Sequence, residues 1–292
     1  MPHEDPPQTC AASDLRGFVR VVRQEGQRHY RDLPWRNTRD PYLILCSEVM
    51  LQQTQVARVL AYWPRWLAAF PTVDALAAAS TADVLALWQG LGYNRRALAL
   101  KKAAEICAAE HAGCVPGSLT QLRALPGVGP ATAAGVCVFA YQQPQVYLET
   151  NVRTVFIHHF FNDKTKVSDA EIIPLAEESC CKEDPRSWYY ALLDYGSYLK
   201  SVMPNPSRRS ATHVRQSTFE GSLRQKRAFL LRQVLEGVGG LSGQELAEAL
   251  AAFELAAGRA AVPPAAVEQL LLDLARGGFI TQTPLGLWEI AD

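Results

Sequence analysis

Two glutamates occupy sequence environments that favour opposite protonation states. Glu48 lies in segment 42–53, where apolar residues recur around it with helical spacing. Burial among apolar side chains raises the pKa of a carboxyl group, which suits a general acid that works near neutral pH. Glu149 precedes Asn151 at the expected start of a helix, whose dipole favours an anion. An acid paired with an anion is an arrangement that cleaves glycosidic bonds, whereas the simpler alternatives are a solvated helix glutamate and a helix cap.

A glycine hairpin lies between two short expected helices, residues 118–124 and 131–141. Gly127 and Gly129 surround Val128, and a proline stands on each side of the group. Glycine reaches positive φ at low cost and has no Cβ that blocks a ligand, and the second helix begins with free amides that favour an anion. The pattern predicts a site for one phosphate, with an ordinary corner between two helices as the alternative.

Neutral polar residues follow one another at the end of segment 42–53. Gln52 and Gln53 are continued by Thr54 and Gln55. Side-chain amides are costly to bury, and they can contact base edges or enter a base stack. A polar helix end is the alternative interpretation.

Positive charge is concentrated in one part of a chain whose net charge is zero. Residues 200–227 contain seven cationic side chains and one acidic side chain, Glu220. Residues 228–292 contain three basic and eight acidic residues, which gives a net charge of −5. Since phosphate affinity comes mainly from lysine and arginine, the basic segment is compatible with a nucleic-acid partner despite the neutral total.

Helical periodicity dominates the chain, and the alternation typical of strands appears only in residues 279–290. We therefore expect an all-α protein with a C-terminal winged helix, in which three helices precede that hairpin. Ser242 and Glu245 form a capping-box pattern at the start of the second of these helices. The expected parts are a disordered N-terminus at 1–13, a helical core at 14–200, a basic arm at 201–227 and the winged helix at 228–292. Within the core, a six-helix domain spans about 42–145, and a second helical domain combines 14–41 with 146–200.

Cysteine spacing gives no indication of a cofactor. None of the seven cysteines forms a CxxC pair, so we expect neither a metal site nor a disulfide framework. No apolar run is long enough to span a membrane, and residues 1–14 lack the apolar core of a signal peptide. The resulting expectation is a cytoplasmic protein without membrane attachment.

Four motifs follow one another along the chain. They are Ser47-Glu-Val-Met-Leu-Gln-Gln-Thr-Gln-Val56, Leu87-Trp-Gln-Gly-Leu-Gly-Tyr93, Leu125-Pro-Gly-Val-Gly129 and Leu148-Glu-Thr-Asn-Val-Arg153. Their order and spacing resemble those of the helix-hairpin-helix DNA glycosylases, closest to the adenine glycosylase (MutY) branch, with the endonuclease III branch as its sibling. The resemblance covers about residues 15–200. It implies two helical domains with a cleft between them, into which a damaged or mispaired base is flipped.

The resemblance also implies roles for the matched residues. Glu48 matches the glutamate that protonates the departing purine, and Asn151 matches an active-site asparagine near the catalytic carboxylate, Glu149. Among the DNA-binding residues, Tyr93 matches the tyrosine that intercalates, and Gln53, next to Gln52, matches the wedge that enters the duplex. Gly127, Val128 and Gly129 match the phosphate-binding hairpin.

Two departures from the family pattern concern the chemistry. Ala131 stands where bifunctional relatives have the lysine that forms a Schiff base, so no amine is available there for covalent strand cleavage. This predicts a monofunctional enzyme. Glu149 stands where the family usually has aspartate, and the extra methylene changes the reach of the anion.

Two further departures concern DNA binding. No cysteine follows Lys200, where the family has a four-cysteine iron–sulfur motif, so we expect the basic arm to take over DNA contacts through Arg208, Arg209 and Arg215. We also expect this sequence to contain no counterpart of the domain that recognises 8-oxoguanine in the adenine glycosylases. The winged helix stands in its place, and its third helix has Arg276 as its only cation, which favours a structural role or a protein contact.

The sequence thus predicts a monofunctional DNA glycosylase, expected to act as a monomer on double-stranded DNA with a mispaired or damaged base. Adenine opposite guanine or 8-oxoguanine is the first expected substrate, and uracil or thymine opposite guanine is the alternative. A non-catalytic DNA-binding protein on the same scaffold is the alternative of another class.

Overall fold

The computed structural model describes residues 15–215 and 217–292, and its chain falls into two compact units. The first unit contains the residues up to Glu48, Pro116–Ala124 and Val128–Arg215. The second contains Val49–Val115, Leu125–Gly127 and Gln216–Asp292. The disorder expected for residues 1–13 lies outside the described residues.

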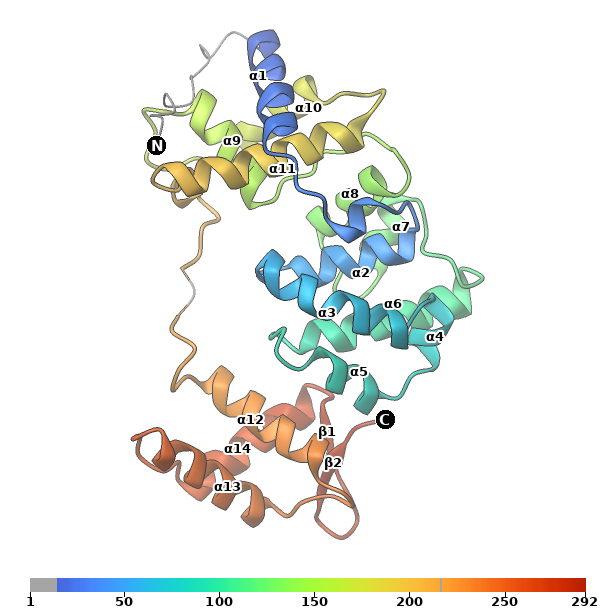
Figure 1. Ribbon diagram of the computed structural model, residues 1–292. Coiled ribbons are helices and arrows are strands. Elements are labelled where there is room, and N and C mark those ends of the chain that lie inside the picture. The colour runs from blue at the N-terminus through green and yellow to red at the C-terminus, as the bar shows by residue number, and fades with distance from the viewer. Residues whose placement is uncertain (1–14, 216) are drawn as a thin grey trace. The chain divides into compact units, whose positions relative to one another are not determined.

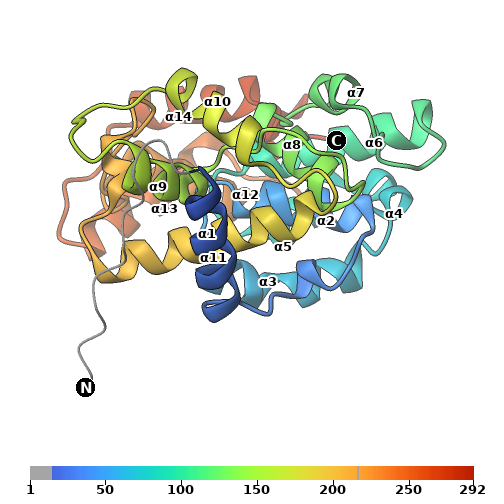
Figure 2. The same ribbon diagram turned by 90° about the horizontal axis from the view of Figure 1, so that it is seen from above.

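Helices and short 3-10 turns build the first unit (Figure 1). Its elements are α1 (Leu15–Arg28), η1 (Pro34–Arg36), α2 (Pro41–Leu51, which continues into the second unit), α7 (Leu119–Ala124), α8 (Pro130–Phe139), α9 (Thr150–Phe160), α10 (Asp169–Ser179), α11 (Pro185–Val202) and η2 (Pro206–Arg209). Helix α11 packs against both α1 and α9, and the crossing of α1 over α11 is visible in Figure 2.

Helix α9 lies in the core of the first unit, and seven of its eleven residues are buried. Phe18 of α1 contacts the rings of Phe156 and Phe160, with centroid separations of 5.1 and 4.8 Å. Gly196 of α11 lies directly against the first turn of α9, where a Cβ on residue 196 would collide with the Asn151 carbonyl oxygen. This close packing fixes the start of α9, which carries two of the expected site residues.

A buried carboxylate ties the N-terminal segment to α11. Asp194 accepts hydrogen bonds from Arg36 at 2.7 and 2.9 Å and from Arg31 Nε at 2.6 Å. Arg186 donates in turn to the carbonyl oxygens of Arg36, at 2.8 Å, and Thr38, at 2.7 Å. Bidentate pairing of this kind satisfies the buried charges and holds the segment that leads into α2.

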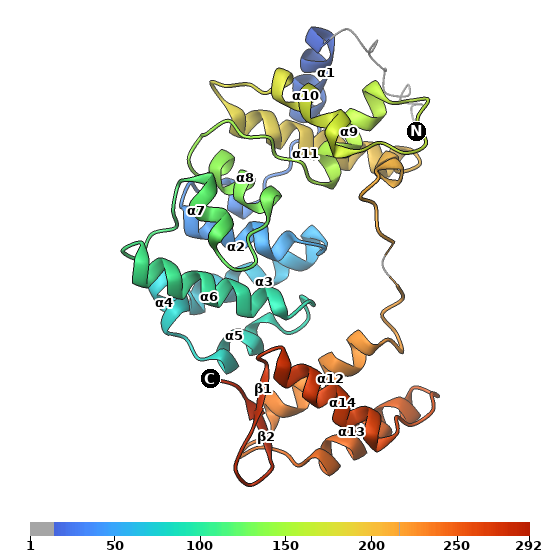
Figure 3. The ribbon, with the colours of Figure 1, turned by 180° about the vertical axis from the view of Figure 1, so that it is seen from behind.

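The second unit combines a helical part with the C-terminal region (Figure 3). Its elements are α3 (Val56–Ala69), α4 (Val73–Ala78), α5 (Thr81–Trp88), α6 (Arg95–Glu110), α12 (Leu223–Glu236), α13 (Gly243–Ala256), α14 (Pro264–Arg276), β1 (Ile280–Gln282) and β2 (Trp288–Ile290). Helix α4 was not anticipated, and its start is capped by the Thr72 hydroxyl, which accepts from the Ala75 amide at 3.1 Å. Helix α12 packs against α5.

The expected elements of the C-terminal region are present. Ser242 and Glu245 form the capping box that begins α13. Strands β1 and β2 pair antiparallel, with Gln282 opposite Trp288. Buried Glu254 of α13 binds Lys226 of α12 at 2.9 Å and Arg259 at 2.7 Å. The prediction of a mainly helical protein with a small C-terminal hairpin is therefore confirmed.

None of the described helices combines the length and apolar character that crossing a bilayer requires.

Candidate active site

The first unit brings the Glu48 carboxyl group together with two residues that sequence reasoning missed. Tyr147 donates a hydrogen bond from its hydroxyl to Glu48 Oε2 at 3.1 Å. Gly135 of α8 leaves the space for this carboxyl group, because a Cβ on residue 135 would lie 2.5 Å from Glu48 Oε2. Glycine at this helix position gave a weak sequence signal, since an interior glycine disfavours a helix unless packing requires it.

Glu48 has the protonation behaviour of a general acid. Part of the residue remains accessible, yet protein atoms surround its carboxyl group, and this burial raises the pKa from 4.5 to about 8. The hydrogen bond from Tyr147 lowers the pKa, and the charge of Glu149 raises it. At neutral pH the Glu48 carboxyl group therefore holds a proton that it can donate.

Glu149 caps the N-terminus of α9. Its carboxylate accepts from the backbone amides of Asn151 and Val152, the latter at 3.0 Å, and from Asn151 Nδ2 at 3.2 Å. The Asn151 Oδ1 atom is buried and has no hydrogen-bond partner among the described residues. The cap fixes both side chains, and it leaves one amide oxygen available as an acceptor.

Opposing effects act on the protonation of Glu149 at the helix start. Burial raises the pKa of Glu149 above its ordinary value, and this effect outweighs the opposing ones. The charge of Lys200 and the hydrogen bonds from Val152 and Asn151 lower the pKa. Sequence reasoning placed Lys200 in the basic segment, whereas the structure places it within electrostatic reach of Glu149, four residues after Gly196 on α11.

In the second unit, the two expected DNA-contacting loops share an unusual backbone conformation. Gln53, just beyond the end of α2, has φ of 53°, and Tyr93, between α5 and α6, has φ of 50°. Side chains other than glycine rarely adopt this left-handed region, and such conformations concentrate at functional sites. The Tyr93 residue is 39% exposed.

Arg96 of α6 connects these two loops. Its guanidinium donates to the carbonyl oxygens of Val49, Met50 and Gln52, at 2.6 to 3.0 Å. It also donates to the Thr54 hydroxyl at 3.0 Å and to the carbonyl oxygens that precede Tyr93, at 3.2 and 2.8 Å. Burial lowers the pKa of Arg96 to about 10, so the side chain stays charged at neutral pH. Arg96 thus closes the C-terminal end of α2 and fixes the tyrosine loop.

Of the two glycines in the hairpin, Gly127 has a positive φ, whereas Gly129 is extended with φ of −77°. Gly127 has φ of +74°, and a Cβ on this residue would lie 2.7 Å from the Ala99 Cβ atom. Gly129 is the N-cap of α8 without a side-chain cap, and a Cβ added there would meet nothing within 4 Å. Val128 between them is buried. The beginning of α8 therefore presents backbone amides without an obstructing side chain, which is the requirement for binding a phosphate.

The beginning of the basic segment packs against α9 through η2, whereas residues 211–215 and 217–220 are exposed and belong to no helix or strand. Arg209 lies in η2 and donates to carbonyl oxygens at the end of α9, including those of Phe161 at 2.7 Å and Asn162 at 3.0 Å. Its contacts therefore support a structural role, in contrast to the expected DNA contact. The other two arginines expected to bind DNA, Arg208 and Arg215, are exposed.

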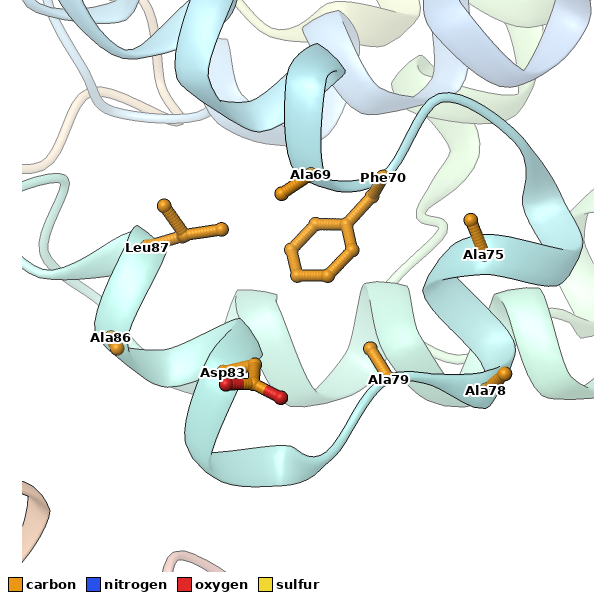
Figure 4. Close-up of a pocket in the computed structure, with 8 residues that line it drawn as sticks. All are labelled: Ala69, Phe70, Ala75, Ala78, Ala79, Asp83, Ala86 and Leu87. Carbon is orange, nitrogen blue, oxygen red and sulfur yellow. The ribbon is translucent and has the colours of Figure 1, made fainter.

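The residues after α11 do not fit an iron–sulfur cluster, because the last cysteine of the chain is Cys181. Within residues 15–215 and 217–292, no three histidine, cysteine or acidic side chains gather into a metal site. A pocket of about 440 Å³ lies among α3, α4 and α5 (Figure 4). It is lined mainly by alanines with Phe70 and Leu87, and its one carboxylate, Asp83, accepts from the Ser80 hydroxyl at 2.6 Å. None of the expected site residues lines it.

A family model describes much of this site. Residues 46–178 match the family model of the HhH-GPD superfamily of base excision DNA repair proteins. The resemblance inferred from the four motifs is confirmed.

Among curated proteins, this chain is similar to adenine DNA glycosylases over part of its length. The protein of Mycobacterium tuberculosis (strain ATCC 25618 / H37Rv) is 52% identical over 130 residues, which cover 44% of this chain and 43% of that protein. The Rattus norvegicus protein is 39% identical over 149 residues, which cover 48% of this chain and 29% of that protein. The chain thus spans less than half the length of these relatives.

Two solved structures share the fold. A thermostable thymine-DNA glycosylase superposes with a TM-score of 0.59 at 23% identity, over 66% of this chain and 90% of that chain. Endonuclease III from a non-covalent DNA complex superposes with a TM-score of 0.57 at 20% identity, over 67% of this chain and 91% of that chain. At this level of identity the likeness concerns the fold alone.

Proposed function

We propose that this chain is a monofunctional DNA glycosylase that removes adenine mispaired with guanine or 8-oxoguanine. The observation that carries the proposal is the Glu48 carboxyl group, which is hydrogen-bonded to Tyr147 and within electrostatic reach of Glu149, in a chain similar to adenine DNA glycosylases. The similarity to a thymine-DNA glycosylase is a similarity of fold, so it does not favour thymine as the substrate.

In the proposed reaction, Glu48 donates its proton to the departing adenine as the N-glycosidic bond breaks. The sugar develops oxocarbenium character, and the Glu149 carboxylate stabilises this positive charge. A water molecule then forms the new bond to the anomeric carbon and loses a proton, which leaves an abasic site. Asn151 holds Glu149 in place, and its buried Oδ1 accepts a hydrogen bond from the substrate or from that water.

The DNA contacts are assigned on the same basis. The hairpin at Gly127 and Gly129 binds one backbone phosphate, and Gln53 and Tyr93 enter the base stack when the nucleotide is flipped out. We also infer that α12, α13, α14 and the β1–β2 hairpin form a winged helix. The one cation of α14, Arg276, pairs with Asp273, so this helix contributes little to phosphate binding.

Incubation with duplexes that carry adenine, uracil or thymine opposite guanine, and adenine opposite 8-oxoguanine, tests the proposal. After alkali treatment, we expect strand breaks at the adenine mispairs. Because Ala131 offers no amine, we expect no break without alkali and no covalent adduct after borohydride reduction. Breaks without alkali would contradict the monofunctional assignment, and breaks only at uracil or thymine would contradict the substrate.

Replacing Tyr147 with phenylalanine is expected to move the pH dependence of excision. The Tyr147 hydroxyl lowers the pKa of Glu48, so its removal raises that pKa further. The Glu48 carboxyl group then keeps its proton to higher pH. The decrease of the single-turnover rate on the alkaline side should therefore occur at a higher pH than in the wild-type protein. Rate profiles from pH 6 to pH 10 measure this (about one pH unit corresponds to 1.4 kcal/mol). A shift to lower pH would show that this hydrogen bond stabilises the acid form instead.

A further inference from the structure

Tyr93 is held by a residue far away in sequence. Arg224, in the first turn of α12, donates from Nη1 to the Tyr93 hydroxyl at 2.9 Å. Its guanidinium also lies 5.7 Å from the centre of the Tyr93 ring, and that of Arg96 lies 5.6 Å from it. Two cations therefore border an exposed aromatic ring whose backbone has a left-handed conformation.

Arg224 is itself fixed at both ends. Its Nη2 atom donates to the Ser217 carbonyl oxygen at 2.6 Å, and the Ser222 hydroxyl caps α12 by accepting from the Gln225 amide. Helix α12 packs against α5, which leads into the tyrosine loop. The Arg224 guanidinium thus connects Ser217, in the segment before α12, with the Tyr93 side chain. All three residues belong to the second unit.

A tyrosine that enters a base stack benefits from a preset orientation, because a free side chain loses rotamer freedom on binding. Arg96 fixes the backbone of the loop by donating to the carbonyl oxygens of Leu91 and Gly92. The hydroxyl is instead bound by Arg224. The C-terminal region therefore supplies the contact that orients the ring.

We propose that Arg224 is a positioning residue for lesion recognition, through which the C-terminal region orients Tyr93 for entry into the DNA duplex. This inference rests on the proposed function and extends it, because it gives the C-terminal region a part in recognising the mispair. Arg224 acts through the Tyr93 hydroxyl, and the chemical step at Glu48 does not depend on it.

A double-mutant cycle tests this with Arg224→Ala, Tyr93→Phe and the double variant in the full chain. The first readout is the dissociation constant for a duplex with 2′-fluoro-deoxyadenosine opposite 8-oxoguanine, since the fluorine disfavours the oxocarbenium-like state and slows excision. A fully paired duplex of the same sequence gives the discrimination ratio. The second readout is the maximal single-turnover rate on the unmodified mispair.

We expect Arg224→Ala to weaken binding of the mispaired duplex about tenfold, as for one hydrogen bond to a charged group, with binding of the paired duplex nearly unchanged. Tyr93→Phe should weaken binding to a similar extent. The double variant should bind the mispaired duplex no more weakly than the single variant with the larger loss of affinity. The maximal rate of Arg224→Ala should stay within about twofold of the wild-type rate, because Arg224 is proposed to act on binding and not on the chemical step. Arg224→Lys should restore only part of the affinity, because an ammonium group cannot bridge the ring and Ser217.

Arg232→Ala is the matched control, since it removes an exposed cation from the same helix and should leave the discrimination ratio unchanged. Additive effects of the two substitutions, or equal losses on mispaired and paired DNA, would overturn the inference and mark Arg224 as an independent phosphate contact. An unchanged affinity would overturn it as well. If the wild-type protein excises nothing, the proposed function fails, while the binding cycle still decides on Arg224.

Discussion

Replacing Glu48 with glutamine is expected to lower the single-turnover rate of base excision by about 10²- to 10⁴-fold, the usual contribution of a general acid. Glutamine keeps the shape of the side chain and can still accept from the Tyr147 hydroxyl, but it has no proton to donate. Binding of mispaired DNA should change little. The rate is measured with enzyme in excess at pH 7, and binding is measured on the same duplex.

The matched control is Glu178→Gln, which neutralises an exposed glutamate on α10 and should leave the rate unchanged. A wild-type rate for Glu48→Gln would contradict the assignment of Glu48 as the acid. The wild-type rate should also fall as the pH rises through about 8, because the Glu48 proton is then lost. The rate should also fall at low pH, where Glu149 becomes protonated. Because Glu48 and Glu149 interact, the apparent pKa values of the two decreases belong to the pair and not to either residue alone.

The same substitution has a predicted consequence for stability. The folded protein holds the Glu48 proton to about pH 8, whereas an unfolded glutamate releases it near 4.5. The contribution of Glu48 to the free energy of unfolding is therefore most favourable below pH 4.5, and it becomes less favourable as the pH rises towards 8. At pH 7 the folded protein has to keep Glu48 protonated, which costs free energy. Glu48→Gln removes this cost and should raise the free energy of unfolding at pH 7, by up to about 3 kcal/mol.

Replacing Gly135 with alanine is expected to reduce the single-turnover rate about 100-fold without abolishing DNA binding. The added Cβ would lie 2.5 Å from Glu48 Oε2 and 3.0 Å from Tyr147 Cε2, so the carboxyl group has to move. A displacement of about 1 Å at a reacting group can cost a factor of 10². The rate is measured at saturating enzyme, with thermal melting to confirm that the variant is folded.

Gly243→Ala is the control for this substitution, because it adds the same methyl group to a helix and meets nothing closer than 3.8 Å. In the interior of a helix, alanine is more favourable than glycine by about 1 kcal/mol. A loss of activity in Gly135→Ala is therefore not expected to come from a lower helix propensity. Full activity of Gly135→Ala would show that the Glu48 carboxyl group does not need its place against α8.

Local signals predicted much of the structure. The capping box at Ser242, the N-cap at Glu149 and the positive φ of Gly127 each follow from residues within a few positions of one another. Such features depend on short-range hydrogen bonds and sterics, and a sequence displays both partners side by side.

Long-range contacts could not be predicted in the same way. Arg96 reads as one more cation at the start of a basic helix, yet it binds carbonyl oxygens more than 40 positions earlier. Tyr147 reads as an ordinary aromatic residue, and its partner Glu48 is 99 positions away. Arg209 reads as a DNA contact because only its charge is visible, whereas the carbonyl oxygens that it binds become apparent in three dimensions.

The most direct measurement is the release of free base from a duplex with adenine opposite 8-oxoguanine, followed by mass spectrometry under single-turnover conditions. The wild-type protein should release adenine and leave an intact strand with an abasic site, and Glu48→Gln should release about 10²- to 10⁴-fold less per unit time. If the wild-type protein binds this duplex and releases no adenine, or if both proteins release it equally fast, the proposed glycosylase mechanism is contradicted.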